Sequence, residues 1–316
     1  MTRRTLAVVM PNYNHAKYLP EAIESVLSQT RLPDEFLILD DASTDESVDI
    51  IQSYARNHSF IRLVEHDQNL GVHAAHRHLF ELAQADYINA MAADDTRYPD
   101  CYKRTMEMAD AFPEAGLIFG QMVMTTEAGE ELSTWGASAW SEPIYADPDR
   151  YRREYLEREA PSQSLSPSTI YRRDRFKEVG WYCEPLASWG DTFAIHAIGL
   201  RYGACYVPEP FARWRVIPEG YSQARIADPR TTLDMINRAV YLMRSPEFRE
   251  YFPPDYVRQW RRRFVWRTIK EYWRCDHTAE FPPGSPIWIR YRHRIPRTLQ
   301  ALLLFCHRTD LAPVKS

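Results

Sequence analysis

Short apolar runs alternate with helical stretches between residues 6 and 90, and this alternation constrains the fold more than any other feature. The apolar runs are bounded by polar residues, which predicts buried strands at Leu6–Met10, Phe36–Leu39, Ile61–Val64 and Tyr87–Ala90. Between them, apolar residues recur at helical spacing in Tyr18–Gln29, Asp45–Tyr54 and Gly71–Ala83. Ser43 or Thr44 is the expected N-cap of the second helix. The pattern predicts an α/β fold with a mostly parallel open sheet flanked by helices.

The order of expected elements changes after Tyr98. Residues 133–167 are rich in Trp, Tyr, Pro and Ser, and we expect a loop-rich region there. The other expected elements are a helix at Tyr102–Ala111, strands at Leu117–Met124, Thr169–Tyr171 and Ala204–Val207, and helices at Arg173–Val179 and Asp191–Leu200. The pattern from Thr231 onward predicts mostly helix, so we expect an α/β domain over residues 1–225 and a helical C-terminal region over 226–316.

Composition and charge exclude several classes of protein. A hydrophobic content of 45% suits a globular chain with a sizeable core, and a net charge of −4 argues against nucleic-acid binding. The five cysteines form no metal-binding or disulfide pattern, which indicates reduced thiols in a cytoplasmic protein. The N-terminal apolar run is too short for a signal peptide, and we expect no transmembrane helix.

Polar segments follow each of the first four expected strands. They read PNYNH (11–15), DDAST (40–44), EHDQNLG (65–71) and MAADD (91–95). In an open α/β sheet, ligands bind outside the carboxyl ends of the strands. Four polar ends at one edge therefore predict a ligand-binding site there.

These segments, in order, resemble glycosyltransferases of family 2, which have the GT-A fold with a mixed sheet. The resemblance covers roughly residues 5 to 215 and rests on VVMPNYN, LDDASTDES, QNLGVHAAHR, AADD and WGD. It implies a nucleoside-diphosphate sugar as donor and a hydroxyl of a glycan or lipid-linked molecule as acceptor. It also implies direct attack on the anomeric carbon, with inversion, and a divalent cation, Mg²⁺ or Mn²⁺.

Donor-binding roles follow from the same resemblance. A carboxylate after the second strand can accept from a pyrimidine imide N–H or from ribose hydroxyls, although an aspartate there also commonly caps the turn. The Asn-x-Gly turn uses glycine for its backbone geometry. The implied donor-binding residues of these segments are Pro11, Asn12, Tyr13, Asp40, Asp41, Asn69 and Gly71.

The expected metal site lies in the fourth polar segment. Asp94 and Asp95 resemble the acidic D-x-D pattern of the family, with Ala92 in the place of its first acid. Asp94 is the expected contact to both metal and donor, because one carboxylate, diphosphate oxygens and water can hold such a cation. His73, His76 and His78 do not share one helix face, so we interpret them as solvated or packed.

Asp191 is the expected general base, in a segment where Gly190 replaces the usual Glu of the family. The alternative role for Asp191 is structural, because an acidic side chain in the first turn of a helix interacts favourably with the helix dipole. Trp189 is the expected stacking surface for the acceptor sugar. The family often carries a His where Ile217 or Pro218 stands, and Arg213 and Arg215 are the expected diphosphate contacts instead.

Two other functions stay open at this point. Ala92, Gly190 and the missing His are compatible with a non-catalytic relative that binds sugar nucleotides. A sugar nucleotidyltransferase would need a Gly-rich phosphate loop, which PNYNHAKY lacks. The basic amphipathic stretches 258–274 and 287–308 predict either peripheral contact with the inner face of the membrane or helices packed on the catalytic domain.

Overall fold

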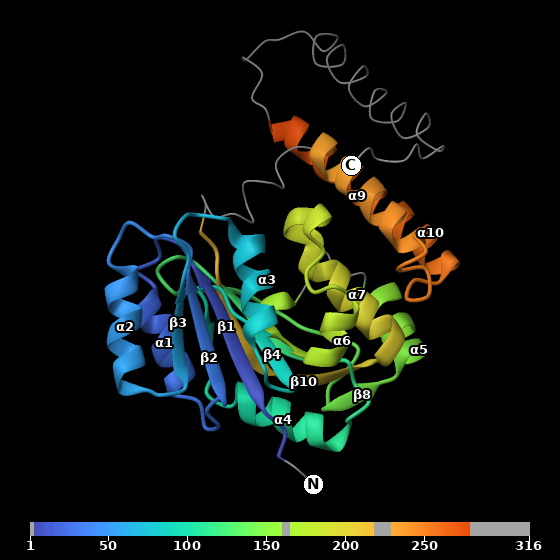
Figure 1. Cartoon of the computed structure of the whole chain (residues 1–316). Coiled ribbons are helices and arrows are strands. Elements are labelled where there is room, and N and C mark those ends of the chain that lie inside the picture. The colour runs from blue at the N-terminus through green and yellow to red at the C-terminus, as the bar shows by residue number, and fades with distance from the viewer. Residues whose placement is uncertain (1–2, 160–164, 218–228, 279–316) are drawn as a thin grey trace, which may run out of the picture. The chain divides into compact units, whose positions relative to one another are not determined.

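The computed structural model describes residues 3–159, 165–217 and 229–278, and the chain divides into two compact units (Figure 1). The first unit spans residues 1–220 and the second spans residues 221–316. The domain boundary expected at 225/226 falls within residues 218–228, outside the described part of the chain.

Four parallel strands form the N-terminal half of the sheet, in the order β3-β2-β1-β4. They are β1 (Leu6–Asn12), β2 (Glu35–Asp40), β3 (Ile61–Glu65) and β4 (Tyr87–Ala90). The helices that connect them are α1 (Leu19–Leu27), α2 (Ser47–Asn57) and α3 (Val72–Leu82). The alternation predicted from the sequence is therefore confirmed.

The second half of the sheet makes it mixed. Strand β9 (Thr169–Arg172) runs antiparallel between β4 and β6 (Leu117–Thr125), and β6 is parallel to β10 (Ala204–Arg215). Three short antiparallel strands complete it: β5 (Thr96–Arg97), β7 (Glu131–Trp135) and β8 (Ile144–Ala146). The predicted fold class, a mixed and mostly parallel open sheet flanked by helices, is confirmed.

Helices cover both faces of this sheet. Side chains of its central strands point alternately to the two faces, and the helices bury both sets. Leu6, Val8 and Met10 of β1 belong to a core cluster with buried residues of α1, α2 and α4 (Cys101–Ala111). Helix α3 packs against β1 and β2 from the other side (Figure 1). The strand ends are thereby fixed relative to one another.

Three local predictions are corrected by the structure. Helix α2 begins at Ser47 after Glu46 rather than at a Ser43 or Thr44 cap, because the Ser43 hydroxyl bonds the preceding turn. The region 133–167 is not mainly loop, since it includes strands β7 and β8. Short helical turns also lie in this region, at Pro148–Arg150, Tyr151–Glu157 and Ser166–Ser168.

Strand β10 is longer than expected and ends at Arg215 rather than at Val207. Pro208 and Pro210 lie within the strand, where irregularities in register between Tyr206 and Ala212 accommodate them. The extension matters for function, because it brings the end of β10 to the end of the loop that follows β4.

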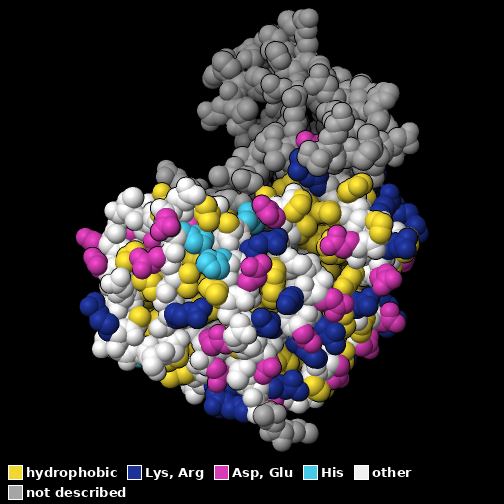
Figure 2. All heavy atoms as spheres, viewed as in Figure 1, with side chains coloured by type: hydrophobic (Ala, Val, Ile, Leu, Met, Phe, Trp, Pro, Cys, Tyr) yellow, Lys and Arg dark blue, Asp and Glu magenta, His cyan; other side chains and the backbone are white. Residues whose placement is uncertain are grey.

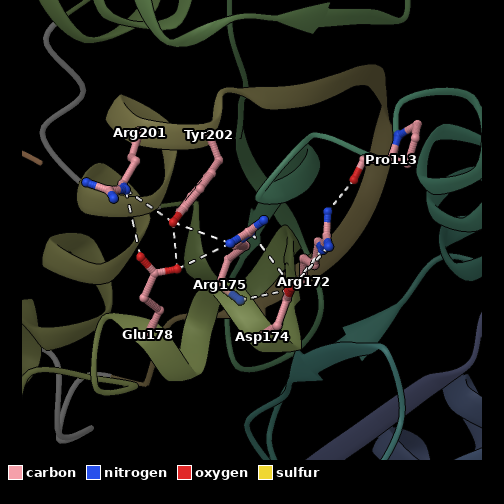
Figure 3. Close-up of polar contacts among 7 residues, drawn as sticks. All are labelled: Pro113, Arg172, Asp174, Arg175, Glu178, Arg201 and Tyr202. Carbon is pink, nitrogen blue, oxygen red and sulfur yellow. Dashed lines mark hydrogen bonds and ion pairs between the residues drawn. The ribbon is translucent and has the colours of Figure 1, made fainter.

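The opposite end of the sheet carries a polar cluster that joins α6 (Arg173–Glu178) to the C-terminal end of α7 (Gly190–Tyr202) (Figure 3). The Tyr202 hydroxyl donates to Glu178 at 2.5 Å and accepts from Arg201 Nε at 3.2 Å. Arg175 lies over the Tyr202 ring, with its guanidinium carbon 4.3 Å from the centroid. These contacts tie the C-terminal end of α7 to α6.

The second unit contains α9 (Pro229–Arg244) and α10 (Pro254–Thr278), which pack against each other. The apolar side chains Val257, Trp260 and Phe264 of α10 are buried, whereas Arg258 and Arg262 are exposed. Over these residues the basic stretch is a packed helix with exposed arginines. The expected amphipathic stretch 287–308 lies outside the described residues. No helix among the described residues is long and apolar enough to cross a membrane.

Candidate functional site

The four polar segments meet at one edge of the sheet. Asn12 pairs in register with Asp40, and Asp40 pairs with Glu65, so the parallel strands β1, β2 and β3 end at the same level. Strand β4 lies beside β1, with Val9 opposite Ala90. The fold therefore brings the residues predicted from these segments together at the carboxyl ends of the strands.

Asn12 and Asp40 support the turn that follows β2. The Asn12 amide donates to Asp40 Oδ2 at 2.8 Å and to Ser43 Oγ at 3.2 Å, and the Ser43 N–H donates to Asp40 Oδ1 at 2.8 Å. Both side chains are buried, with 2% and 1% of their surface exposed. Asp40 is thus the aspartate of the pair that caps the turn, and ligand-facing positions are left to its neighbours.

Two residues at this turn have backbone conformations that only glycine adopts easily. Asn14 has φ of 55° and Ala42 has φ of 62°. Such conformations cost on the order of 1–3 kcal/mol and concentrate at ligand sites. Beside them, Tyr13 is 43% exposed and Pro11 is half-buried, so the edge offers an aromatic ring and a proline to a flat ligand group.

Asp41 holds the segment that follows β3. Its Oδ1 accepts from His66 Nδ1 at 2.7 Å and from the Leu70 N–H at 3.0 Å, and its Oδ2 accepts from the Gly71 N–H at 2.8 Å. Burial alone would raise the pKa of this carboxyl, but the bonds from Leu70, His66 and Gly71 hold its pKa below the usual value. Asp41 is therefore a buried carboxylate at the nucleotide end of the predicted site.

Asn69 and Gly71 shape the start of α3. Asn69 Oδ1 accepts from the Gly71 N–H at 3.0 Å, and Gly71 has φ of 86°. The conformation explains the glycine, because a side chain there would be strained although no neighbouring atom blocks it. Asn69 is exposed and Gly71 is partly exposed.

Asp94 and Asp95 differ sharply in their surroundings. Asp95 is only 2% exposed, and its Oδ1 accepts from the Arg215 N–H at 3.0 Å. Asp94 is partly exposed. Burial raises the pKa of both carboxyls, and Asp94 further raises that of Asp95, whereas His15 lowers that of Asp94. Asp95 thus fastens β10 to the loop, and Asp94 is the more exposed carboxylate of the pair.

Arg215 links three segments that meet at this edge of the sheet. Its guanidinium donates to the carbonyl oxygens of Asp94 and Glu127 at 3.0 and 2.7 Å and to Glu21 Oε2 at 2.5 Å. Arg213 lies closer to solvent and stacks over the Tyr98 ring at 5.3 Å, with its Nε buried and without a hydrogen-bond partner. Of the two predicted arginines, Arg213 has the more available donors.

Asp191 lies in the first turn of α7 and accepts from the N–H and hydroxyl of Thr192 at 2.5 and 3.2 Å. Burial raises the pKa of Tyr182, Asp191 raises it further, and Arg97 lowers it. Arg97 also lowers the pKa of the buried Asp95 carboxyl. Trp189 is half-buried immediately before α7.

Gly190 has a steric explanation that the sequence did not give. A Cβ at this position would lie 2.6 Å from the Cys183 carbonyl oxygen, because the turn Glu184–Trp189 closes on it. The Cys183 N–H donates to the Gly190 oxygen at 3.3 Å. The glutamate of the family pattern cannot occupy this backbone without rearrangement.

Sequence reasoning missed several members of the edge. His66 Nε2 lies 2.9 Å from His78 Nδ1, which joins a histidine from the end of β3 to one on α3. His66 stands directly after an expected strand and could have been found by that position. Glu21 and Glu127, which hold Arg215 and Lys17 respectively, come from remote segments and carried no such signal.

The described residues contain no group of three or more His, Cys, Asp or Glu side chains that could hold a metal ion by itself. Asp94 nevertheless suits a divalent cation that takes its other ligands from diphosphate and water. Ala92, in the place of the family's first acid, is exposed at the same turn. The residues present fit a cation held by one carboxylate from the protein.

Solved structures with the same architecture define the class of fold. The chain matches Staphylococcus aureus TarS 1–349 in complex with UDP-GlcNAc with a TM-score of 0.61 and 15% identity, over 84% of this chain and 81% of that one. It matches the mannosyltransferase PcManGT from Pyrobaculum calidifontis, in complex with GDP-Man and Mn²⁺, with a TM-score of 0.59 and 16% identity, over 96% and 81%. The fold is the GT-A fold of glycosyltransferases.

Residues 7–180 match the family described as glycosyl transferase family 2, and the chain belongs to this family. A curated relative, the uncharacterized glycosyltransferase YibD of Escherichia coli K12, is 38% identical over 104 residues, which is 33% of this chain and 30% of that protein. The chain spans less than two thirds of the length of the first relatives it matches. The resemblance stated from the sequence is confirmed.

Proposed function

We propose that this protein is an inverting glycosyltransferase that moves a sugar from a nucleoside-diphosphate sugar to a hydroxyl of a glycan or lipid-linked acceptor. One observation carries the proposal: a single edge of the sheet holds the Asp41 carboxylate, the exposed ring of Tyr13 and the partly exposed Asp94. The chain that presents this edge belongs to family 2. The relatives' complexes with UDP-GlcNAc and GDP-Man support a nucleotide sugar as the donor.

The nucleotide would bind across the ends of β1 and β2. A carboxylate offers about four lone-pair positions, and three donors already occupy positions on Asp41. The position left on Oδ2 can accept one N–H or hydroxyl of the donor. Pro11 and Tyr13 would pack against the base, and Arg213 would bind diphosphate oxygens.

Asp94 would hold a divalent cation, Mg²⁺ or Mn²⁺, between itself and the diphosphate. When bound, such a cation offsets the negative charge on the leaving nucleoside diphosphate. The relative in complex with Mn²⁺ supports this assignment. The predicted role of Asp95 as a second metal ligand is less favoured, since its carboxylate is buried and bonded to the Arg215 backbone.

Asp191 would act as the general base for the acceptor. The acceptor hydroxyl oxygen forms a bond to the anomeric carbon as its proton passes to the Asp191 carboxylate. The bond from the anomeric carbon to the diphosphate oxygen breaks, and the electron pair leaves with the nucleoside diphosphate. A single displacement of this kind inverts the anomeric configuration, and Trp189 would stack on the acceptor sugar.

The test is turnover of a panel of nucleotide sugars by the wild type and by Asp191→Asn. We expect the variant to lose about 10²–10⁴-fold in kcat, the usual contribution of a general base, while its affinity for the nucleoside diphosphate changes little. Mass spectrometry of donor and product measures the rate, and calorimetry measures the affinity.

Asp110→Asn is the matched control, because Asp110 is an exposed aspartate whose partner Arg4 lies just before β1, at the opposite end of the sheet. Equal turnover by wild type and Asp191→Asn would contradict the assigned base. A wild type that binds the donor and never turns it over would favour the non-catalytic sugar-nucleotide-binding relative instead.

A further inference from the structure

A chain of three side chains, Asp41, His66 and His78, lies at the nucleotide end of the site. His66 Nδ1 is 2.7 Å from Asp41 Oδ1, and His66 Nε2 is 2.9 Å from His78 Nδ1. The two imidazole planes differ by only 6°, with ring centroids 5.2 Å apart. The chain thereby connects the end of β2, the end of β3 and the middle of α3.

The direction of the bond between His66 and Asp41 follows from the carboxylate. Asp41 is ionised, since its hydrogen bonds hold its pKa below the usual value, and an ionised carboxylate only accepts. His66 therefore carries a proton on Nδ1 and donates it to Asp41. One proton lies between His66 Nε2 and His78 Nδ1, so this bond extends the chain from Asp41 to α3 with either ring as its donor.

This chain also fixes a stretch of backbone. Asp41 accepts from the N–H groups of Leu70 and Gly71, and the His66 N–H donates to the Asp40 carbonyl at 3.0 Å. Segment 66–71 is thereby held against the end of β2, although most of its side chains are exposed. The side chains of His66 and Asp41 are themselves only 10% and 4% exposed. Figure 2 shows histidines gathered on the face that carries α3.

We propose that His66 and His78 are positioning residues that hold Asp41 and segment 66–71 in the conformation that receives the base and ribose of the donor nucleotide. The inference rests on the proposed function, which supplies the nucleotide. Neither histidine needs to touch the reacting atoms, because Asp191 and Asp94 lie on other elements. Their loss should weaken nucleotide binding and leave the chemical step intact.

Amide substitutions can separate the two bonds of His66. An asparagine places its amide nitrogen near the position of Nδ1, and a glutamine places it near Nε2. His66→Asn should keep the donor to Asp41 and lose only the link to His78, whereas His66→Phe loses both. His78→Asn retains a donor toward His66, and His78→Phe does not.

The experiment titrates UDP, GDP, dTDP, CDP and ADP into the wild type and these four variants by calorimetry. For the nucleotide that binds, we expect the dissociation constant to rise about tenfold in both Phe variants, equivalent to ~1.4 kcal/mol, and less in both Asn variants. Donor KM should rise in parallel at unchanged kcat. His58→Phe, at the other end of β3, is the matched control and should bind like the wild type.

Four outcomes separate the positioning role of the two histidines from the proposed function of the protein. Graded loss of affinity with rescue by asparagine supports the positioning role. Wild-type affinity in both Phe variants, with the nucleotide still bound, overturns this inference and leaves the proposed function standing. A fall in kcat without a change in KM overturns it as well. Failure of the wild type to bind any of the five nucleotides contradicts the proposed function and this inference together.

Discussion

Neighbouring residues of the same type have different roles in this protein because their side chains meet different partners. Asp40 caps a turn with the help of Asn12, whereas Asp41 holds the segment after β3. Asp95 bonds the backbone of β10, whereas Asp94 is partly exposed. In both pairs one aspartate supports the structure, and this support fixes the position of the other.

The single carboxylate of the proposed metal site, Asp94, leads to a prediction at Ala92. Because Ala92 is exposed, Ala92→Asp adds the missing acid at little structural cost and should raise the affinity for Mn²⁺ in the presence of UDP by about tenfold, since ligand charge tunes affinity. Asp94→Asn should lower it by a similar factor. Electron paramagnetic resonance of free Mn²⁺ measures both changes, and unchanged affinity in both variants would rule out this site.

Among the elements, α7 shows how one helix serves stability at one end and the site at the other. Its C-terminal end is tied to α6 by Glu178, Arg201 and Tyr202 (Figure 3), and its first turn carries Asp191. The turn before it is strained, with φ of 48° at Ala187. Together these features set the position of the proposed base.

Gly190 is the residue at which this arrangement can be tested. Gly190→Ala places a Cβ 2.6 Å from the Cys183 carbonyl oxygen, and backbone atoms cannot swing away as a flexible side chain would. We expect a loss of about 1–3 kcal/mol in the free energy of unfolding, with reduced turnover because Asp191 moves. Chemical denaturation measures the free energy of unfolding. Ala92→Asp is the control for this measurement, because it adds side-chain atoms at an exposed position. Wild-type stability and turnover in Gly190→Ala would show that the turn is adaptable.

At the scale of the whole molecule, the described unit with the GT-A fold is combined with a basic helical region. Part of α10 buries its apolar side chains against its own unit and exposes Arg258 and Arg262. We propose that the more C-terminal stretch 287–308 contacts the inner face of a membrane, where a lipid-linked acceptor would be found.

Vesicle flotation tests this proposal with the full chain and with a variant that lacks residues 281–316. The full chain should float with vesicles that contain anionic phosphatidylglycerol, less so at high salt, because arginines supply the attraction. The shortened chain should stay at the bottom of the gradient. If both chains behave alike, the C-terminal stretch has no role in membrane contact.

The N-terminal half of the sheet, and the meeting of four polar segments at its edge, could be predicted from the sequence alone. The spacing of apolar residues and the polar residues after each strand are local properties of the chain. The strand at Leu6–Met10 and the segments after the strands could therefore be interpreted without tertiary contacts. The family resemblance was equally visible in PNYN and DDASTD. Local patterns failed at β10, which continues past Val207 through irregularities in register, and at Ser43, whose hydroxyl accepts from Asn12 and Asn14 instead of capping α2.

Which member of each pair is buried and which is more exposed could be established only from the tertiary structure. The partners of Asp41, Asp95 and Arg215 lie 25 to 194 residues away in the chain, and no sequence period encodes such contacts. The same holds for the closure of Cys183 on Gly190, which explains a missing glutamate by steric exclusion. Roles in the site depend on hydrogen-bond partners and burial, and both arise when strands that are distant in sequence end side by side.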